Sequence, residues 1–184
     1  MNPFAQLISM LFDIYVSVVL LRFFLQYFRA DYYNPFSQFV VKATNIFVKP
    51  LRRIIPGFGG IDLSTLIVAW LLIVAKYVLI LTISGATGEV HMAALVIFSF
   101  VEVISAAIRL YIFLVFVRVI LSWIAQGNYN PFVLVITQLT EPPLARIRRL
   151  LPDAGGFDFS PMLLLIILYF INSSIDYYLR PLIL

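Results

Sequence analysis

Four long apolar stretches constrain what this chain can fold into. They span residues 4–28, 63–83, 93–124 and 161–179, and each is long enough to cross a bilayer as a helix. Hydrophobic residues make up 62% of the chain and charged residues 12%, about half the charged fraction of a typical soluble domain. This composition excludes a soluble globule, a disordered chain and an ordinary nucleic-acid-binding domain. We therefore predict an all-α membrane protein with four transmembrane helices.

Residue types that carry most enzyme chemistry are scarce. The chain has no cysteine and one histidine, His91. Disulfides, thiolate metal sites, cysteine nucleophiles and histidine clusters for zinc are thereby excluded. The sequence predicts no catalytic residue, no cofactor-binding residue and no metal ligand, so we do not expect an enzyme.

The chain contains an internal duplication with an offset of 96 positions. Asn34-Pro35-Phe36 aligns with Asn130-Pro131-Phe132 without a gap. Further residues shared by the two copies are Arg52, Arg53, Pro56, Gly59, Gly60, Asp62 and Ser64 in the first, and Arg148, Arg149, Pro152, Gly155, Gly156, Asp158 and Ser160 in the second. We infer two tandem repeats, residues 1–88 and 89–184. Each holds two spans, so the repeats should have the same orientation, with a symmetry axis along the membrane normal.

Basic residues concentrate in the two long connections between the paired spans. Positive charge near the ends of spans favours the cytoplasmic side. We therefore expect both long loops in the cytoplasm and both termini outside.

The repeated motif predicts a helix start followed by an amphipathic segment. Asn34 and Asn130 are suited to cap a helix, and the proline that follows each is tolerated at the first helical position. Segments 36–49 and 132–141 are expected to lie in the cytoplasmic interface, with a re-entrant course as the competing interpretation. The glycine pairs predict tight turns, and Asp62 with Ser64, like Asp158 with Ser160, predicts a cap on the next span.

The paired arginines of each repeat have two interpretations. Arg52 and Arg53, with their copies Arg148 and Arg149, could dock a protein partner or anionic lipid headgroups, because basic residues gain about 1 kcal/mol each beside anionic lipid. They could equally be topology anchors that hold each loop inside.

Ionisable residues within the spans predict a polar seam. Asp13, Lys76, Glu102 and Arg109 are costly at membrane depth unless they face a partner or water. Asp13 and Arg109 are equivalent positions of opposite charge, so we expect them to pair across the repeat interface. The seam would be either a structural ion pair or an ion or proton path. Arg22 and Arg118, which are also equivalent, are expected to extend to the headgroups.

The duplicated pattern of Asn-Pro-Phe, Arg-Arg-(Ile/Leu)-(Ile/Leu)-Pro and Gly-Gly-x-Asp-x-Ser resembles the YggT family of small bacterial membrane proteins. The resemblance covers nearly the whole chain in two copies and implies a multi-pass protein of the bacterial inner membrane, with relatives in chloroplasts. It also implies links to osmotic-shock tolerance, potassium handling and cell division, and in plastids to cytochrome assembly and nucleoid distribution. It carries over no catalytic residue.

Two functions remain open from the sequence. The first is a membrane scaffold or assembly factor with two basic cytoplasmic elements. The second is a small ion channel or transport component affecting potassium, which would need an oligomer because four helices could hardly enclose a pore. The expected partners are anionic membrane lipids, a membrane or cytoplasmic protein and a second copy of the chain, with no direct nucleic-acid partner.

Overall fold

A computed structural model describes residues 3–55, 57, 60–85, 91–124, 130–152 and 158–179. Every regular element in these ranges is a helix. The four apolar helices are α1 (Pro3–Tyr27), α3 (Leu63–Ser84), α4 (Met92–Ile124) and α6 (Ser160–Ser174), and a π-helical turn η1 (Ile175–Leu179) extends α6. With η1 included in the last of them (Ser160–Leu179, 20 residues), all four are long and apolar enough to cross a membrane. The predicted all-α fold with four spans is confirmed.

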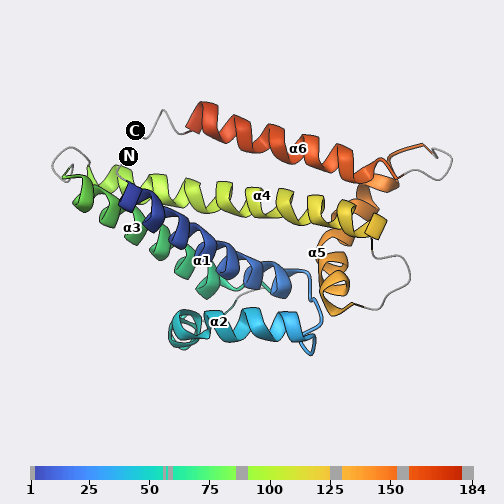
Figure 1. Cartoon of the computed structure of the whole chain (residues 1–184), viewed down its shortest axis with the longest axis horizontal. Coiled ribbons are helices and arrows are strands. Elements are labelled where there is room, and N and C mark those ends of the chain that lie inside the picture. Colours follow the sequence, from blue (N-terminus) through green and yellow to red (C-terminus); the bar gives the residue numbers. More distant parts are fainter. Residues whose placement is uncertain are drawn as a thin grey trace.

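The two connecting helices, α2 (Pro35–Arg52) and α5 (Pro131–Arg148), have equal lengths and start 96 positions apart. Figure 1 shows that α1 and α4 both run away from the end where α1 begins and α6 ends, and that α2 and α5 follow them. We call the region of α2 and α5, with the adjoining span ends, the α2/α5 end. The tandem, parallel arrangement follows from this order.

The Asn-Pro-Phe motifs start α2 and α5 as predicted. The side-chain oxygen of Asn34 accepts the backbone N–H of Phe36 at 2.9 Å, and that of Asn130 accepts the N–H of Phe132 at the same distance. Each cap satisfies a donor that the first helical turn leaves unpaired. Proline occupies the first helical position of both helices, where no donor is needed.

Helix α5 runs further than the predicted segment 132–141, because it continues through Pro142 and Pro143 to Arg148. A proline inside a helix cannot donate to the carbonyl four residues earlier. For Pro143 this carbonyl belongs to Leu139, and the hydroxyl of Tyr111 donates to it at 2.8 Å. The span helix α4 therefore supplies the hydrogen bond that the proline removes, and α5 continues.

Two apolar cores lie mainly within one repeat each, although Val103 joins the first and Leu25 and Val40 join the second. In the first, α1 and α3 bury side chains that include Val19, Leu20, Ala69 and Ile73. In the second, α4, α5 and α6 bury a cluster that includes Leu114, Val115, Val135, Leu139 and Leu164. The connecting helices thus pack on the spans of their own repeat and are not attached to them by the covalent chain alone.

The two Asn-Pro-Phe motifs also join the repeats. The amide of Asn34 donates to the backbone oxygen of Pro131 at 2.8 Å, and the rings of Phe36 and Phe132 meet edge to face with centroids 5.1 Å apart. Asn34 is buried. A sequence motif that predicts a helix start in each repeat therefore also forms a contact between the repeats.

This arrangement predicts unequal effects of two equivalent substitutions. Asn130→Ala removes a helix cap and should lower the free energy of unfolding by about 1 kcal/mol. Asn34→Ala removes a cap and a hydrogen bond to a carbonyl of the other repeat, so the loss should be about 2 kcal/mol. Unfolding of the detergent-solubilised chain, followed by circular dichroism, measures both. Equal losses would contradict an inter-repeat role for Asn34.

Candidate functional site

The α2/α5 end holds a polar network that occurs twice, once in each repeat. Its first tie is a tyrosine on the span that donates to a carbonyl of the connecting helix. Tyr15 donates to the oxygen of Ala43 at 3.1 Å, and Tyr111 donates to that of Leu139 at 2.8 Å. Donors and acceptors are both 96 positions apart, so the fold repeats this contact atom for atom.

The second tie is an arginine that extends from the span into the connecting helix. In the first repeat one nitrogen of Arg22 donates to the oxygen of Val41 at 3.2 Å and to the side chains of Thr44 and Asn45, each at 2.9 Å. Arg22 is 6% exposed, so our expectation that it extends to the headgroups is wrong. A buried guanidinium requires acceptors, and the polar face of α2 supplies them.

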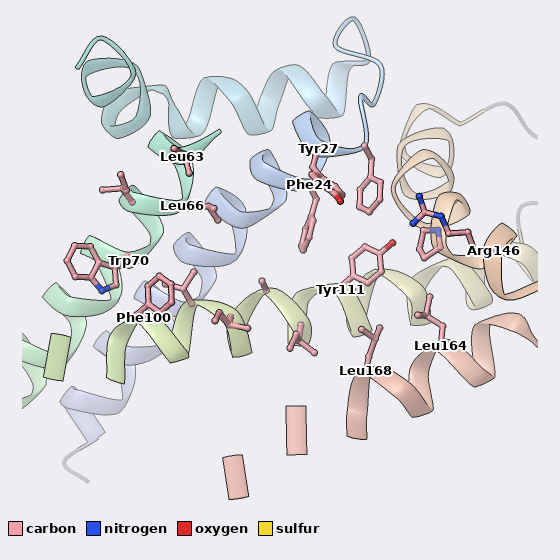
Figure 2. A pocket seen from close by; sticks show the side chains of 17 residues that line it. Phe24, Tyr27, Leu63, Leu66, Trp70, Phe100, Tyr111, Arg146, Leu164 and Leu168 are labelled. Atoms are coloured by element: carbon pink, nitrogen blue, oxygen red, sulfur yellow. The ribbon is translucent and has the colours of Figure 1, made fainter. Parts of the chain in front are cut away.

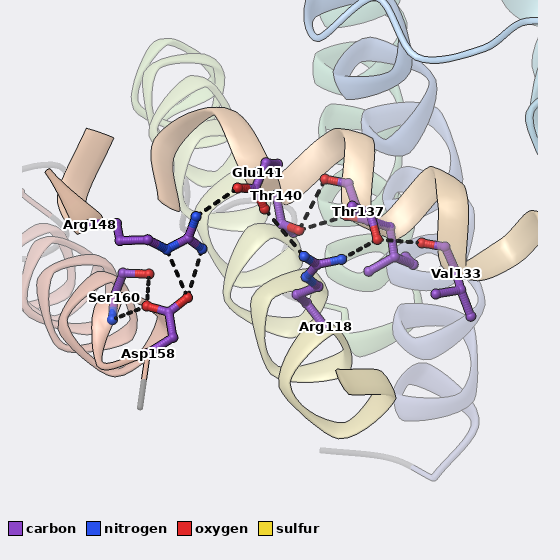
Figure 3. Close-up of polar contacts among 9 residues, drawn as sticks. Arg118, Val133, Thr137, Thr140, Glu141, Arg148, Asp158 and Ser160 are labelled. Carbon is purple, nitrogen blue, oxygen red and sulfur yellow. Dashed lines mark hydrogen bonds and ion pairs between the residues drawn. The ribbon is translucent and has the colours of Figure 1, made fainter. Parts of the chain in front are cut away.

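The equivalent arginine of the second repeat contacts a carboxylate. Arg118 donates to the hydroxyl of Thr137 and pairs with Glu141 at 3.2 Å (Figure 3). Glu141 occupies the position of Asn45. The sequence analysis did not predict that these arginines bind the connecting helices. The signal that could have indicated it is that Arg22 and Arg118 occupy equivalent positions of the two repeats.

The third tie joins the end of each connecting helix to the start of the next span. Arg52 pairs with Asp62 at 3.0 Å and also donates to Gln26 at 2.7 Å. In the second repeat Arg148 pairs with Asp158 at 2.7 Å and with Glu141 at 2.9 Å (Figure 3). Two of the four predicted docking arginines, Arg52 and Arg148, therefore have partners within the chain.

The other two docking candidates lie on the surface. Arg53 and Arg149 are exposed, and so are the aliphatic residues that follow them: Ile54 is 77% exposed and Leu150 82%. Each repeat thus presents one arginine and one aliphatic side chain at equivalent positions. Docking by these residues stays a prediction.

The pair of Arg148 and Asp158 changes the ionisation of both groups. Partial burial opposes ionisation of Asp158, but hydrogen bonds from Arg148 and Ser160 outweigh it and lower the pKa of Asp158 to about 2. The bonds to Asp158 and Glu141 raise the pKa of Arg148 above its ordinary value. The pair is therefore fully ionised at neutral pH.

The predicted caps on the second span of each repeat differ in detail. Asp62 is the N-cap of α3 and accepts the N–H of Thr65 at 3.3 Å, while the hydroxyl of Ser64 donates to the oxygen of Ile55. Asp158 accepts the N–H of Ser160 at 2.9 Å and its hydroxyl at 2.6 Å, one residue ahead of the N-cap position of α6.

The predicted turns ahead of these caps are described only in part. Gly60 has a φ of 86°, which favours glycine, as the predicted turn requires. Pro152 follows the end of α5 and is the last residue of the described range 130–152. Pro56, Gly59, Gly155 and Gly156 lie outside the described residues.

The predicted polar seam is divided into two pairs. Lys76 of α3 pairs with Asp13 of α1 at 2.8 Å, and Glu102 pairs with Arg109 on the same helix at 2.5 Å. The prediction that Asp13 and Arg109 pair with each other is therefore wrong. Arg109 has a carboxylate two turns away on its own helix face, and Asp13 has a lysine on the span packed beside it. Lys76 and Glu102 are buried, whereas the side chains of Asp13 and Arg109 are 55% and 43% exposed.

Asp13 belongs to a polar stripe on the outer face of α1. Gln6, Ser9, Asp13 and Ser17 recur at helical spacing and line a shallow groove. Polar groups on the outer face of a span are costly against lipid.

An apolar groove of about 710 Å³ opens between α1, α3, α4 and α6 (Figure 2). Trp70 and Phe100 lie near one end, and Arg146 of α5 lies at the other. Leu164 and Leu168 of α6 contribute to the wall. The groove thus combines an apolar interior with Arg146 of α5, which is the one cation among the described residues that line it.

Within the described ranges, histidines and carboxylates form no group of three or more that could hold a metal ion. The networks at the α2/α5 end consist of arginines with carboxylates, amides and hydroxyls. Such groups can bind and orient an anion or hold helices together.

The comparisons with known proteins agree with the repeated geometry. The sequence profile of CCB3/YggT matches residues 1–83 and again residues 97–179, so its two matches fall on the two repeats. The chain belongs to the CCB3/YggT family. Membership extends over both repeats and covers all four spans.

Individual relatives match almost end to end. An uncharacterized protein in the proC 3′ region of Vibrio alginolyticus is 48% identical over 173 residues, which is 94% of this chain and 92% of the relative. The uncharacterized protein YggT of Escherichia coli is 42% identical over 176 residues, covering 95% and 90% of the two chains. The uncharacterized protein ycf19 of Galdieria sulphuraria is 41% identical over 63 residues, 33% of this chain and 63% of the relative. No solved structure matches this CCB3/YggT chain.

The pair of Arg148 and Asp158 predicts a pH-dependent stability. The carboxyl of Asp158 has an ordinary pKa of 3.8 when unfolded and about 2 when folded, so its contribution is complete above pH 4 and is lost as the pH falls toward 2. The groups are partly exposed, so solvent screening limits this contribution to about 1 kcal/mol or less.

The measurement is chemical unfolding of wild type and Asp158→Asn at pH 7 and at pH 2.5. We expect a smaller difference between the two proteins at the lower pH. Arg148→Gln serves as the control, because in that background Asp158→Asn should cost less at pH 7. A difference that is constant with pH would contradict the ion pair.

Proposed function

We propose that this chain is a scaffold or assembly factor of the bacterial inner membrane, with its α2/α5 end in the cytoplasm and both termini outside. The observation that carries the proposal is the pair of exposed arginine–aliphatic units, Arg53 with Ile54 and Arg149 with Leu150. Further exposed bases lie at the same end: Arg29, Lys42, Lys49 and Arg146. Positive charge near span ends favours the cytoplasmic side.

The internal ion pairs support this function because they fix the position of the exposed arginine–aliphatic units. Arg52 and Arg148 hold the ends of α2 and α5 to the following spans. The next residue in each case is the exposed arginine. Because the preceding residue is fixed by an ion pair, each exposed arginine loses less conformational entropy on binding a partner than it would in a flexible loop.

The proposed partners are anionic lipid headgroups and a membrane or cytoplasmic protein. An arginine next to an aliphatic side chain suits the membrane interface, where the charge meets phosphate and the apolar group enters the acyl boundary. A protein partner with an acidic surface would use the same residues. The family resemblance suggests osmotic-stress tolerance or cell-envelope and division processes as the setting. No enzymatic reaction is part of this proposal.

The test replaces both exposed arginines. Arg53→Gln with Arg149→Gln should abolish rescue of osmotic-shock survival in a strain without its own copy, because both docking charges are lost. Both residues are on the surface, so expression and thermal stability should stay within the wild-type range. The control is Arg53→Lys with Arg149→Lys, which keeps the charge and should keep most of the rescue. Full rescue by the glutamine variant would contradict the proposal.

A second candidate function is a small oligomeric ion channel that affects potassium homeostasis. One observation favours it: the polar stripe with Asp13 lies on the outer face of a span, where a second copy of the chain would remove it from lipid. Together with the buried Lys76, this stripe could contribute to an ion path between protomers.

Potassium and proton flux in liposomes distinguishes the two functions. If the stripe conducts, Asp13→Asn should change the flux by tenfold or more. Asp31→Asn, which alters a carboxylate outside the spans, is the control and should leave it unchanged. Liposomes that hold folded, inserted protein and show no flux would favour the scaffold.

A further inference from the structure

A cavity of about 510 Å³ lies between the end of α1 and helix α2, within the first repeat. Four of its lining residues are cationic, namely Arg22, Arg29, Lys49 and Arg52. Among the described residues that line it there is no carboxylate. The cavity is therefore strongly electropositive, and it is distinct from the surface formed by Arg53 and Arg149.

The second repeat shows how the same framework is neutralised internally. There Glu141 pairs with both Arg118 and Arg148, the equivalents of Arg22 and Arg52 (Figure 3). In the first repeat the position of Glu141 is occupied by Asn45, whose amide oxygen accepts from Arg22 at 2.9 Å. A neutral amide thus contacts Arg22 where the other repeat has a carboxylate that pairs with two arginines.

Two further differences increase the positive charge of the first repeat. Lys49 and Arg29 line the cavity, and both equivalent positions of the second repeat are alanine in the sequence. Four bases line the first cavity, and two carboxylates lie near them: Asp62, which pairs with Arg52, and Asp31, which lies between the lining residues Ala30 and Tyr32. This leaves an excess of two positive charges.

The same count for the second repeat gives zero. Its two bases, Arg118 and Arg148, are matched by the two carboxylates Glu141 and Asp158. The charge difference is therefore local to the first repeat, although the helix framework is shared.

A buried hydroxyl gives independent evidence for a ligand. Ser37 lines the cavity, is 2% exposed, and its oxygen has no hydrogen-bond partner among the described residues. A buried polar group without a partner costs free energy. The equivalent residue of the second repeat, Val133, has no such group. The hydroxyl is thus present only where the uncompensated charge is present.

We propose that this cavity binds a phosphate group. Phosphate carries the negative charge that the excess of bases requires, and its oxygens can accept from guanidinium, ammonium and hydroxyl donors together. The cavity of about 510 Å³ has room for more than the bare anion, so the proposed ligand is a phosphate ester: either the headgroup of an anionic phospholipid or a soluble phosphate monoester. The inference does not depend on the scaffold function, because Arg53 and Arg149, the exposed arginines that carry that proposal, do not line the cavity.

Binding is measured with the full chain in dodecyl maltoside at constant ionic strength. Isothermal titration uses two probes, dihexanoyl phosphatidylglycerol for the lipid source and glycerol 3-phosphate for the soluble source. We expect saturable binding of at least one probe. Binding of the lipid alone assigns the headgroup, and binding of glycerol 3-phosphate assigns a soluble ester.

Three variants test the site. Asn45→Glu introduces the carboxylate of the second repeat and should weaken binding at least tenfold while preserving the fold, since Arg22 and Arg52 gain an internal partner. Lys49→Gln should weaken binding about fivefold. Lys42→Gln is the matched control, because Lys42 is an exposed lysine of α2 outside the cavity, and its binding should stay within twofold of wild type.

Two results would overturn the proposal. The first is no saturable binding of either probe by the folded wild-type chain. The second is binding that Asn45→Glu and Lys49→Gln leave unchanged or that Lys42→Gln weakens equally. The docking function is tested separately, since Arg53→Gln with Arg149→Gln leaves the cavity intact.

Discussion

The arginine that extends from each first span into its connecting helix is the interaction on which the α2/α5 end depends. Packing of apolar side chains gives little direction to a helix at a membrane surface, because lipid is as apolar as the side chains. Arg22 and Arg118 supply direction, since a guanidinium has several donors in a fixed plane. In each repeat this arginine, the tyrosine tie and the arginine–aspartate pair together fix the depth, the rotation and the end of the connecting helix.

The elements of the fold could be predicted from sequence because each depends on local signals. Apolar length defines the spans, and Asn-Pro-Phe defines where α2 and α5 begin. The end of α5 could not be predicted in this way. Helix α5 continues past Pro142 and Pro143, and Tyr111, on another helix, donates a hydrogen bond to the carbonyl that the second proline leaves free. That compensation depends on tertiary contact.

The candidate site was harder to predict for the same reason. The sequence identifies Arg52, Arg53, Arg148 and Arg149 as a set but does not show that the first of each pair has an internal partner. The depth of Asp13 and Arg109 could be estimated, and the seven-residue spacing on one helix face fits the pair of Arg109 with Glu102, whereas the partner of Asp13 depends on which face of α1 meets its neighbour. That partner is Lys76. Equivalent positions in a repeat thus predict equivalent depth, and they predict contact only when the partner residues are repeated too.

The duplication keeps the helix framework and changes its charges. The tyrosine tie, the arginine tie and the arginine–aspartate pair recur at an offset of 96 positions, so the backbone of both repeats is stabilised in the same way. What differs lies inside that framework: Asn45 against Glu141, Lys49 against alanine, Ser37 against Val133. A purely structural network would gain from Glu141 in both copies, because the carboxylate neutralises two arginines. An amide at this position in the first repeat leaves the cations free to bind an anion from outside the chain. The ligand is therefore expected in the first repeat and not at the motif that both repeats share.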